Sequence, residues 1–273
     1  MSGFVTAEKA IKGLGAGYVT ANGTWRKFSQ GYATNNGVWR KCYQAGIPFE
    51  DLPIGSLVSI NLNNVPTSFI LVHYGLPSEV YDESCSGAWL LMKDIWQKMT
   101  WKVDYNYRHN YDGSDVDIAL NSNYIGEFDD KVQSYIKEVK IPYYKSSVLS
   151  GADGLTVKSF IPSASELCVD PTLADGSVHD IGSCLDYFSD VPDRFAHAKR
   201  IAQLNGTASI WYTRTPNTRN TSGRYVVAVT ANGSLNGNYF KDQAQGVRPM
   251  IILPSEMSVK GEPNADGSYT LLV

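Results

Sequence analysis

A tandem repeat near the start of the chain constrains the fold more than any other feature of the sequence. The segments GYVTANGTWRKF (17–28) and GYATNNGVWRKC (31–42) align without gaps at an offset of 14 residues. Each copy has an Asn-Gly pair between short runs rich in Tyr, Thr, Val and Trp, and Asn-Gly favours the type I′ turn of a tight hairpin. The repeat therefore predicts two short β-hairpins. A two-stranded hairpin is marginal alone, so we expect Trp25 and Trp39 to pack on the main domain, on another subunit or on a larger assembly, unless they form a small core of their own.

Composition predicts a folded chain and argues against several partners. The 273 residues are 43% hydrophobic and 19% charged, which is enough for one large domain or two modest ones. The net charge of -3, without a run of four Lys or Arg, argues against nucleic acid and anionic membranes. No apolar run approaches the roughly 20 residues of a membrane span, and the first residues lack the apolar core of a leader, so we expect neither Sec-dependent secretion nor membrane insertion. The four cysteines form no CxxC pair and are interpreted as reduced, buried thiols: Cys42, Cys85, Cys168 and Cys184.

After the repeat, the hydrophobic pattern predicts strands at both ends of the chain and helices between them. Residues 57–75 are expected to form two antiparallel strands joined through Asn63-Asn64, and residues 87–101 a short helix or a strand leading into one. Helices are predicted at 114–120, with Ser114 as the cap, at 128–139 and at 193–206. The remaining predicted elements are a strand ending near 161 and a short helix that contains Glu166 and is capped by Ser163 or Ser165. Three strands are predicted within 208–216, 224–235 and 246–254, and a hairpin between 257–259 and 269–272. This order indicates an α+β fold.

The order of particular segments carries a family resemblance. The segments are LPIGSLVSINLNNVPTSFILVHYG, YDESCSGAWLLMKDI, NYDGSDVDIALNSNYIGEF, FIPSASEL, IWYTRTP and GVRPMIILP. Together, over about residues 49–255, they resemble a family of domains of unknown function from gut Firmicutes and their phages, which is similar to the C-type-lectin and formylglycine-generating-enzyme fold. The resemblance implies a C-type-lectin-like domain with a mixed or antiparallel sheet at 47–255, preceded by the hairpin repeats at 1–46 and followed by a C-terminal β-hairpin at 256–273.

The closing signature of that family is an aromatic pair, a basic residue and Ser-Pro, followed by Val-Arg-Pro-Ala and an apolar strand. The matching residues here are Trp211, Tyr212, Arg214, Pro216, Val247, Arg248 and Pro249, with Thr215 in place of Ser and Met250 in place of Ala. From this match we expect Trp211 and residues 247–253 to lie on neighbouring strands of one sheet. Arg248 is expected to be partly buried there and to find hydrogen-bond acceptors, since an unsatisfied buried guanidinium is costly.

The tandem repeat also looks like those that open tail and baseplate proteins of phages of these bacteria. Combined with the lectin-like resemblance, it implies a phage virion protein made in the bacterial cytoplasm: a tail-fibre, baseplate or receptor-binding protein. The partners expected are other virion proteins, a host cell-surface glycan or protein, and copies of the same chain in a homotrimer. The alternative is a purely structural decoration or collar protein that never contacts a receptor.

No catalytic or metal-binding pattern stands out. The sequence has no GxSxG, HExxH, P-loop or GxGxxG motif, and its histidines are scattered: His73, His109, His179 and His197. Relatives that generate formylglycine use a cysteine pair near the C-terminal part of the domain, and here no cysteine follows Cys184. We therefore expect no enzyme activity, no cofactor and no metal. Glu262-Pro263-Asn264 resembles a calcium-binding tripeptide of lectins, but we interpret it as a hairpin turn, and residues 112–117 as a helix cap.

The stretch from 205 to 243 has the composition of binding loops. Tyr supplies rigid contact area, Arg planar donors, and Asn and Ser adaptable hydrogen bonds. In phage proteins of the lectin-like fold that retroelements diversify, the variable residues occupy this part of the domain. The predicted ligand contacts are Tyr212, Arg214, Asn217, Arg219, Arg224, Asn236, Asn238 and Tyr239. The predicted structural residues are Trp25, Trp39, Trp211 and Arg248. A polar loop without a ligand remains the alternative.

Overall fold

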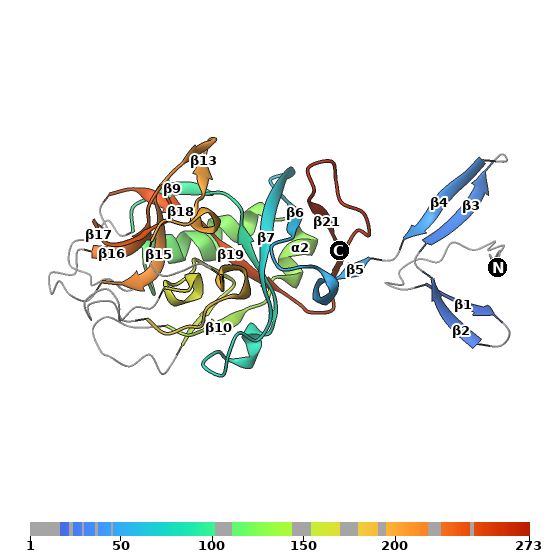
Figure 1. Cartoon of the computed structure of the whole chain (residues 1–273), viewed down its shortest axis with the longest axis horizontal. Coiled ribbons are helices and arrows are strands. Elements are labelled where there is room, and N and C mark those ends of the chain that lie inside the picture. The colour runs from blue at the N-terminus through green and yellow to red at the C-terminus, as the bar shows by residue number, and fades with distance from the viewer. Residues whose placement is uncertain are drawn as a thin grey trace.

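A computed structural model of the chain describes most of the residues. The described ranges are 17–21, 24–28, 30–35, 38–44, 46–101, 111–143, 154–169, 180–190, 195–217, 225–240 and 243–273, with the backbone alone for 17–44 and 238–240. The fold is mixed α/β, with many strands and few, short helices (Figure 1). Two sheets form the body of the molecule.

The larger sheet has eight strands and is mostly antiparallel. In spatial order these are β12 (Ser159–Phe160), β19 (Met250–Leu253), β8 (Gly87–Met92), β7 (Val65–Gly75), β6 (Leu57–Leu62), β21 (Tyr269–Leu272), β20 (Ser258–Val259) and β5 (Ile47–Pro48). The exception is the parallel pair β21 and β6. Between β6 and β7, Leu62 pairs with Val65, and Asn63 and Asn64 both have positive φ, as a two-residue hairpin loop requires. The Asn63-Asn64 prediction is therefore confirmed.

The smaller sheet has five strands and positions the sequence signature. In spatial order these are β17 (Leu235–Phe240), β16 (Tyr225–Val229), β15 (Trp211–Pro216), β18 (Gln245–Val247) and β9 (Gln97–Met99). Strand β15 pairs antiparallel with β16 and parallel with β18, where Trp211 lies opposite Gly246. Gly246 has no room for a side chain, because a Cβ would lie 2.7 Å from the Ile210 carbonyl oxygen.

Short helical segments and two two-stranded pairings complete the body. The helices are α1 (Asp115–Ala119), continued by a π-helical turn (Leu120–Tyr124) and a 3-10 turn (Ile125–Glu127), α2 (Asp130–Tyr135), and 3-10 turns at Phe49–Asp51, Glu83–Cys85, Ser165–Leu167, Asp186–Phe188 and Ala198–Arg200. The pairings are β10 (Val139–Ile141) with β11 (Leu155–Val157) and β13 (Gln203–Leu204) with β14 (Thr207–Ala208). The Ser114 side chain accepts a hydrogen bond from the Asp117 amide, so this predicted cap is confirmed.

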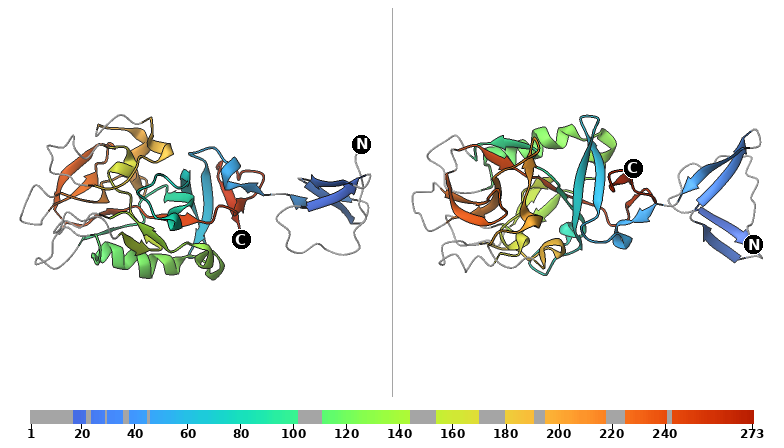
Figure 2. Two further views of the ribbon diagram at one scale, coloured as in Figure 1. Left: turned by 90° about the horizontal axis from the view of Figure 1, so that it is seen from below. Right: turned by 45° about the horizontal axis from the view of Figure 1, so that its top comes forward.

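The tandem repeat forms the two predicted hairpins. They are β1 (Gly17–Ala21) with β2 (Thr24–Phe28) and β3 (Gln30–Asn35) with β4 (Val38–Gln44). Ala21 pairs with Thr24 and Asn35 with Val38, which leaves a two-residue loop at each Asn-Gly. Three views show both hairpins beyond β5, apart from the body (Figures 1 and 2). The surroundings predicted for Trp25 and Trp39 concern side chains outside those that the structure describes.

Buried apolar side chains of the two sheets form one continuous hydrophobic core. Trp89 on β8 and Trp211 on β15 are fully buried members of the same hydrophobic cluster. Trp89 makes edge-on ring contacts with Tyr81 and Phe160. The C-terminal hairpin β20–β21 pairs with β5 and β6, so residues 256–273 extend the main sheet.

Three sequence predictions need correction. The helix predicted over 193–206 is wrong: the described part, from residue 195, holds only a 3-10 turn followed by the β13–β14 hairpin, and Phe195, expected inside, is 65% exposed. Residues 87–101 contain strands β8 and β9 and no helix. Residues 247–253 were predicted to lie next to Trp211 in one sheet, but only Val247, at the end of β18, belongs to the sheet of Trp211. Residues 250–253 form β19, which belongs to the larger sheet.

The cysteine prediction is also wrong for one pair. Cys168 and Cys184 form a disulfide bond, 16 residues apart in sequence. Cys85 is a free, buried thiol as predicted, and burial raises its pKa to about 11. The side chain of Cys42 is outside the described part of the chain.

Candidate functional site

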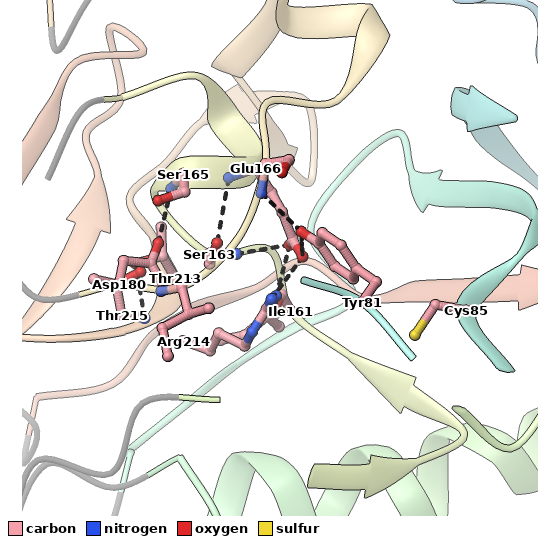
Figure 3. A network of polar contacts seen from close by, with 12 residues as sticks. Tyr81, Cys85, Ile161, Ser163, Ser165, Glu166, Asp180, Thr213, Arg214 and Thr215 are labelled. Carbon is pink, nitrogen blue, oxygen red and sulfur yellow. Dashed lines mark hydrogen bonds and ion pairs between the residues drawn. The ribbon is translucent and has the colours of Figure 1, made fainter. Parts of the chain in front are cut away.

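A buried ion pair anchors strand β15, which is part of the predicted binding segment (Figure 3). Arg214 donates from Nη1 to Glu166 Oε2 and from Nη2 to Glu166 Oε1, both at 2.6 Å. Both side chains are almost completely buried, with 2% and 0% of their area exposed. Nη1 also donates to the Ile161 carbonyl at 2.9 Å. A buried charge is tolerated only when it is paired and hydrogen-bonded, and this guanidinium is both.

The Glu166 carboxylate is positioned by the local sequence Ser163-Ala-Ser-Glu166. The Glu166 amide donates to Ser163 Oγ at 3.2 Å, and the Ser163 amide donates back to Glu166 Oε2 at 3.0 Å. This reciprocal pair is a capping box, which begins the 3-10 turn Ser165–Leu167 and directs the carboxylate toward Arg214. The short capped helix predicted around Glu166 is therefore confirmed as a single turn.

A second chain segment is attached to this turn by polar contacts. Asp180 Oδ2 accepts a hydrogen bond from the Ser165 amide at 2.8 Å, and the Leu185 amide donates to the Glu166 carbonyl at 3.2 Å. Tyr81 connects both segments: its hydroxyl donates to Glu166 Oε1 and accepts from the Ser183 amide, each at 3.0 Å. The Cys168–Cys184 disulfide joins the same two segments covalently.

Electrostatics match a structural role for this network. Burial alone would lower the pKa of the Arg214 guanidinium, but the adjacent charge of Glu166 and its hydrogen bonds raise it overall. Burial raises the pKa of Tyr81 and of Asp180. Since Arg214 and Glu166 have almost no exposed area, a substrate does not reach either side chain. The network can hold β15 in place but has no open position for chemistry.

Arg248, predicted as a structural residue, is buried against Trp211. Its guanidinium lies 5.1 Å from the centre of a Trp211 ring and donates from Nε to the Met92 carbonyl and from Nη2 to the Lys93 carbonyl, both at 2.9 Å. The prediction of a hydrogen-bonded Arg248 near Trp211 is confirmed, and the burial is nearly complete rather than partial, with 1% exposed. Burial lowers its pKa to about 10, and the charges of Tyr187 and Asp94 offset only part of this shift.

The predicted ligand contacts divide into buried and outer positions. Tyr212, Arg214 and Asn217 are buried, with the Tyr212 hydroxyl donating to the Gln243 carbonyl and the Asn217 amide to the Gly237 carbonyl. Because these three side chains are buried, a ligand at the surface does not contact them. Their prediction as ligand contacts is therefore corrected: they belong to the interior of the domain. Asn236 on β17 is exposed. Arg219 and Arg224 lie outside the described residues, as do the side chains of Asn238 and Tyr239.

Within the described ranges, no three His, Cys, Asp or Glu side chains group in a way that could hold a metal ion. Asn264 of the suspected calcium tripeptide is used by its own turn: Nδ2 donates to Ser268 Oγ at 3.0 Å, and Oδ1 accepts from Thr270 Oγ1 at 3.2 Å. His73 Nδ1 lies 2.7 Å from Asp186 Oδ2. No helix of the described chain is long and apolar enough to cross a membrane.

Sequence reasoning missed several residues of the network. Tyr81 and Asp180 were not singled out, and the partner of Arg214 is 48 residues away in sequence. The predicted helix cap, at Ser163 or Ser165, was the one local signal, and it indicated the turn that contains Glu166 but not the partner of Glu166.

Fold and network together define a β-rich mixed α/β domain whose signature strand is fixed by a buried Glu–Arg pair. Comparison with family models matches residues 86–255, more than half of the chain, to the family described as "Domain of unknown function (DUF6273)". The chain belongs to this family. The match starts immediately before β8 and ends just after β19, so it contains Glu166 and Arg214. No curated protein and no solved structure matches the chain.

Proposed function

We propose that the chain is a bacteriophage virion protein whose family domain is C-type-lectin-like and recognises the host surface, as in a tail fibre, baseplate or receptor-binding protein. The observation that carries the proposal is the pairing of the repeat. Each hairpin pairs only within itself among the described strands and lies beyond β5, apart from the body. A two-stranded hairpin gains little stability alone, so the doublet needs a partner surface on another virion protein or on copies of the chain, as in a trimer.

The disulfide bond supports the proposal that the protein works outside the cell. Disulfides persist in oxidising surroundings and are rare in the reducing cytoplasm. Cys168–Cys184 therefore suits a protein that is made in the bacterial cytoplasm and works in the released particle.

Deletion of residues 1–46 tests the attachment role. The deleted segment ends before β5, so the truncated chain keeps every strand of the eight-stranded sheet. We expect it to fold, with a cooperative thermal transition, but to be missing from phage particles and to lose its oligomeric state in light scattering. Unfolding of the truncated chain would mean that the doublet belongs to the core. A folded truncated chain that still enters particles would overturn the attachment role.

A purely structural decoration or collar protein is the second candidate. The burial of Tyr212, Arg214 and Asn217 favours it, because three of the eight predicted contacts serve the scaffold. The discriminating experiment replaces Arg219, Arg224 and Asn236 together by Ala and measures adsorption to host cells. Recognition through this segment predicts lost adsorption with an unchanged melting temperature, whereas normal adsorption favours the structural role.

A further inference from the structure

The two cysteines of the disulfide bond differ in their access to solvent. Cys184 is exposed, whereas Cys168 is half-buried at the end of the 3-10 turn Ser165–Leu167. Cys85 is completely buried, and burial raises the pKa of its thiol to about 11. A thiol reacts with an oxidant only when the oxidant can reach it and when it loses its proton. Of these three thiols, that of Cys184 is therefore the first that an oxidant in solution meets.

Contacts that involve neither sulfur atom hold the chain in place on both sides of Cys184. On one side, the Ser183 amide donates to the Tyr81 hydroxyl at 3.0 Å. That hydroxyl donates in turn to Glu166 Oε1 at 3.0 Å (Figure 3). On the other side, the Leu185 amide donates to the Glu166 carbonyl at 3.2 Å, and the Leu185 side chain is fully buried in the core. These contacts keep Cys184 next to the turn without the help of the disulfide bond.

The arrangement also suits the two cysteines in their reduced form. Both sulfur atoms lie near one backbone oxygen, the Leu185 carbonyl, at 3.8 Å from Cys168 Sγ and 3.7 Å from Cys184 Sγ. A thiol is a weak hydrogen-bond donor, and a carbonyl oxygen has two lone pairs. Opening the bond therefore leaves neither sulfur atom without a polar contact.

We propose that the Cys168–Cys184 bond forms late, in the already folded domain, and then fastens residues 180–185 to the turn that contains Glu166. The chain folds in the bacterial cytoplasm with both thiols reduced, and a low-molecular-weight disulfide oxidises them after release from the cell. Folding first also selects the pair, because four cysteines of an unfolded chain can pair in several ways. The timing rests on the virion role proposed above, whereas the chemistry of the two cysteines does not.

The oxidation takes two exchange steps. The Cys184 thiolate attacks one sulfur of the small disulfide, which forms a mixed disulfide and releases one small thiolate. The Cys168 thiolate then attacks Cys184 Sγ, which forms the protein disulfide and releases the second small thiolate. Each cysteine gives up one proton and one electron, and the small disulfide takes up both pairs to become two thiols. An excess of that thiol, as in the cytoplasm, reverses both steps.

The test oxidises the full chain, reduced beforehand, with oxidised glutathione, and mass spectrometry of alkylated peptides identifies the products. The reduced chain should already show a cooperative thermal transition and should form the Cys168–Cys184 bond alone. Cys168→Ser should accumulate glutathione on Cys184, and Cys184→Ser should accumulate clearly less on Cys168. A reduced chain without a thermal transition, a bond between another pair, or equal accumulation in the two variants would each overturn the proposal.

A matched pair of variants tests the alignment by the folded chain. Tyr81→Phe removes only the hydroxyl that connects Glu166 to Ser183, and should slow formation of the bond about fivefold, the factor that one hydrogen bond contributes. Tyr74→Phe is the control, because the Tyr74 hydroxyl donates to a glutamate outside both segments, and it should keep the native rate. Equal rates in the two variants would show that this contact does not align the cysteines, and would overturn the proposal.

The timing is measured in infected cells and in released particles, with thiols trapped by acid and alkylation. We expect reduced cysteines in the cells and the bond in the particles. A bond that is complete in the cytoplasm, or absent from the protein in particles, would overturn late formation. Absence of the chain from particles would overturn the virion role, and would leave the measurements on the purified chain unaffected.

Discussion

Arg214 and Glu166, 48 residues apart in sequence, form a two-pronged ion pair with both N···O distances at 2.6 Å. The pair connects β15 of the smaller sheet to the turn that follows β12 of the larger sheet. Because both side chains are buried, each depends on the other to offset the loss of water. The relative position of the two sheets at this point therefore rests on a charged contact as well as on the apolar core.

Removing one partner of this pair is expected to be strongly destabilising. Arg214→Met leaves the Glu166 carboxylate buried without its cation and should lower the free energy of unfolding by about 3–5 kcal/mol. Urea denaturation measures the loss. The control is Lys199→Gln, which breaks the more exposed pair between Lys199 and Asp190 and should have little effect. Equal losses in the two variants would contradict the structural role of the buried pair.

A double replacement separates the pair from the packing around it. Glu166→Leu with Arg214→Met removes both charges together, so neither remains unpaired. We expect the double variant to lose clearly less than the sum of the two single losses, measured in the same denaturation experiment. Simple additivity would indicate that the two side chains are not energetically coupled.

The Cys168–Cys184 disulfide should contribute about 2–4 kcal/mol to stability, because it restricts the unfolded chain between two segments that are also hydrogen-bonded in the folded state. Dithiothreitol should lower the denaturation midpoint of the native chain but not that of the Cys168→Ser/Cys184→Ser variant. Cys42→Ser is the control and should keep the full response. A native chain that does not respond to the reductant would contradict the bond.

Local turn chemistry explains which parts of the fold were predictable. The Asn63-Asn64 turn, the Ser114 cap and the repeat hairpins depend on neighbouring residues, so the sequence indicated each of them. The helix predicted at 193–206 failed because its 3–4 apolar spacing competes with a tertiary contact: Arg200 is buried and donates to the Leu167 carbonyl from Nε and Nη2.

The candidate site was less predictable, since its partners meet only in the folded chain. Tyr212 and Arg214 have the residue types of a binding loop, and only their burial assigns them to the scaffold. The pairing of Cys168 with Cys184 has no local signature either, because four cysteines allow several connectivities.

Two glycines with nearly equal φ provide a test of close packing. Gly233 has φ of 83°, and an added Cβ would lie 2.1 Å from the His197 carbonyl oxygen. Gly267 has φ of 80° with no atom within 4 Å of the added Cβ. Gly267→Ala should cost about 1 kcal/mol from backbone strain alone, whereas Gly233→Ala should cost clearly more, because the backbone must also move. Similar losses by thermal denaturation would show that the His197 contact is not constraining.

Two carboxylates are expected to change stability with pH in opposite directions. Burial raises the pKa of Asp180 above its usual 3.8, so the folded state binds this proton more tightly than the unfolded chain. The resulting stabilisation is complete below pH 3.8 and is lost as the pH rises through the folded-state pKa. Asp180→Asn cannot ionise and keeps one acceptor oxygen for the Ser165 amide, but it loses the acceptor of the Ile181 amide at every pH. The stability advantage of the native chain over Asp180→Asn should therefore be largest in acid and shrink as the pH rises toward 7.

Asp266 provides the opposite case on the surface. Hydrogen bonds from the Ser268 side chain and amide lower the pKa of Asp266, so its stabilisation is present above pH 3.8 and is lost as the pH falls through the lower folded-state value. Asp266→Asn should therefore be less stable than the native chain at pH 7 and approach it in acid, by a small amount because the group is exposed. Urea midpoints of the three proteins between pH 2 and pH 7 measure both effects. If the advantage of the native chain over Asp180→Asn grows with rising pH, as it should for Asp266→Asn, the assignment of a raised pKa to Asp180 is wrong.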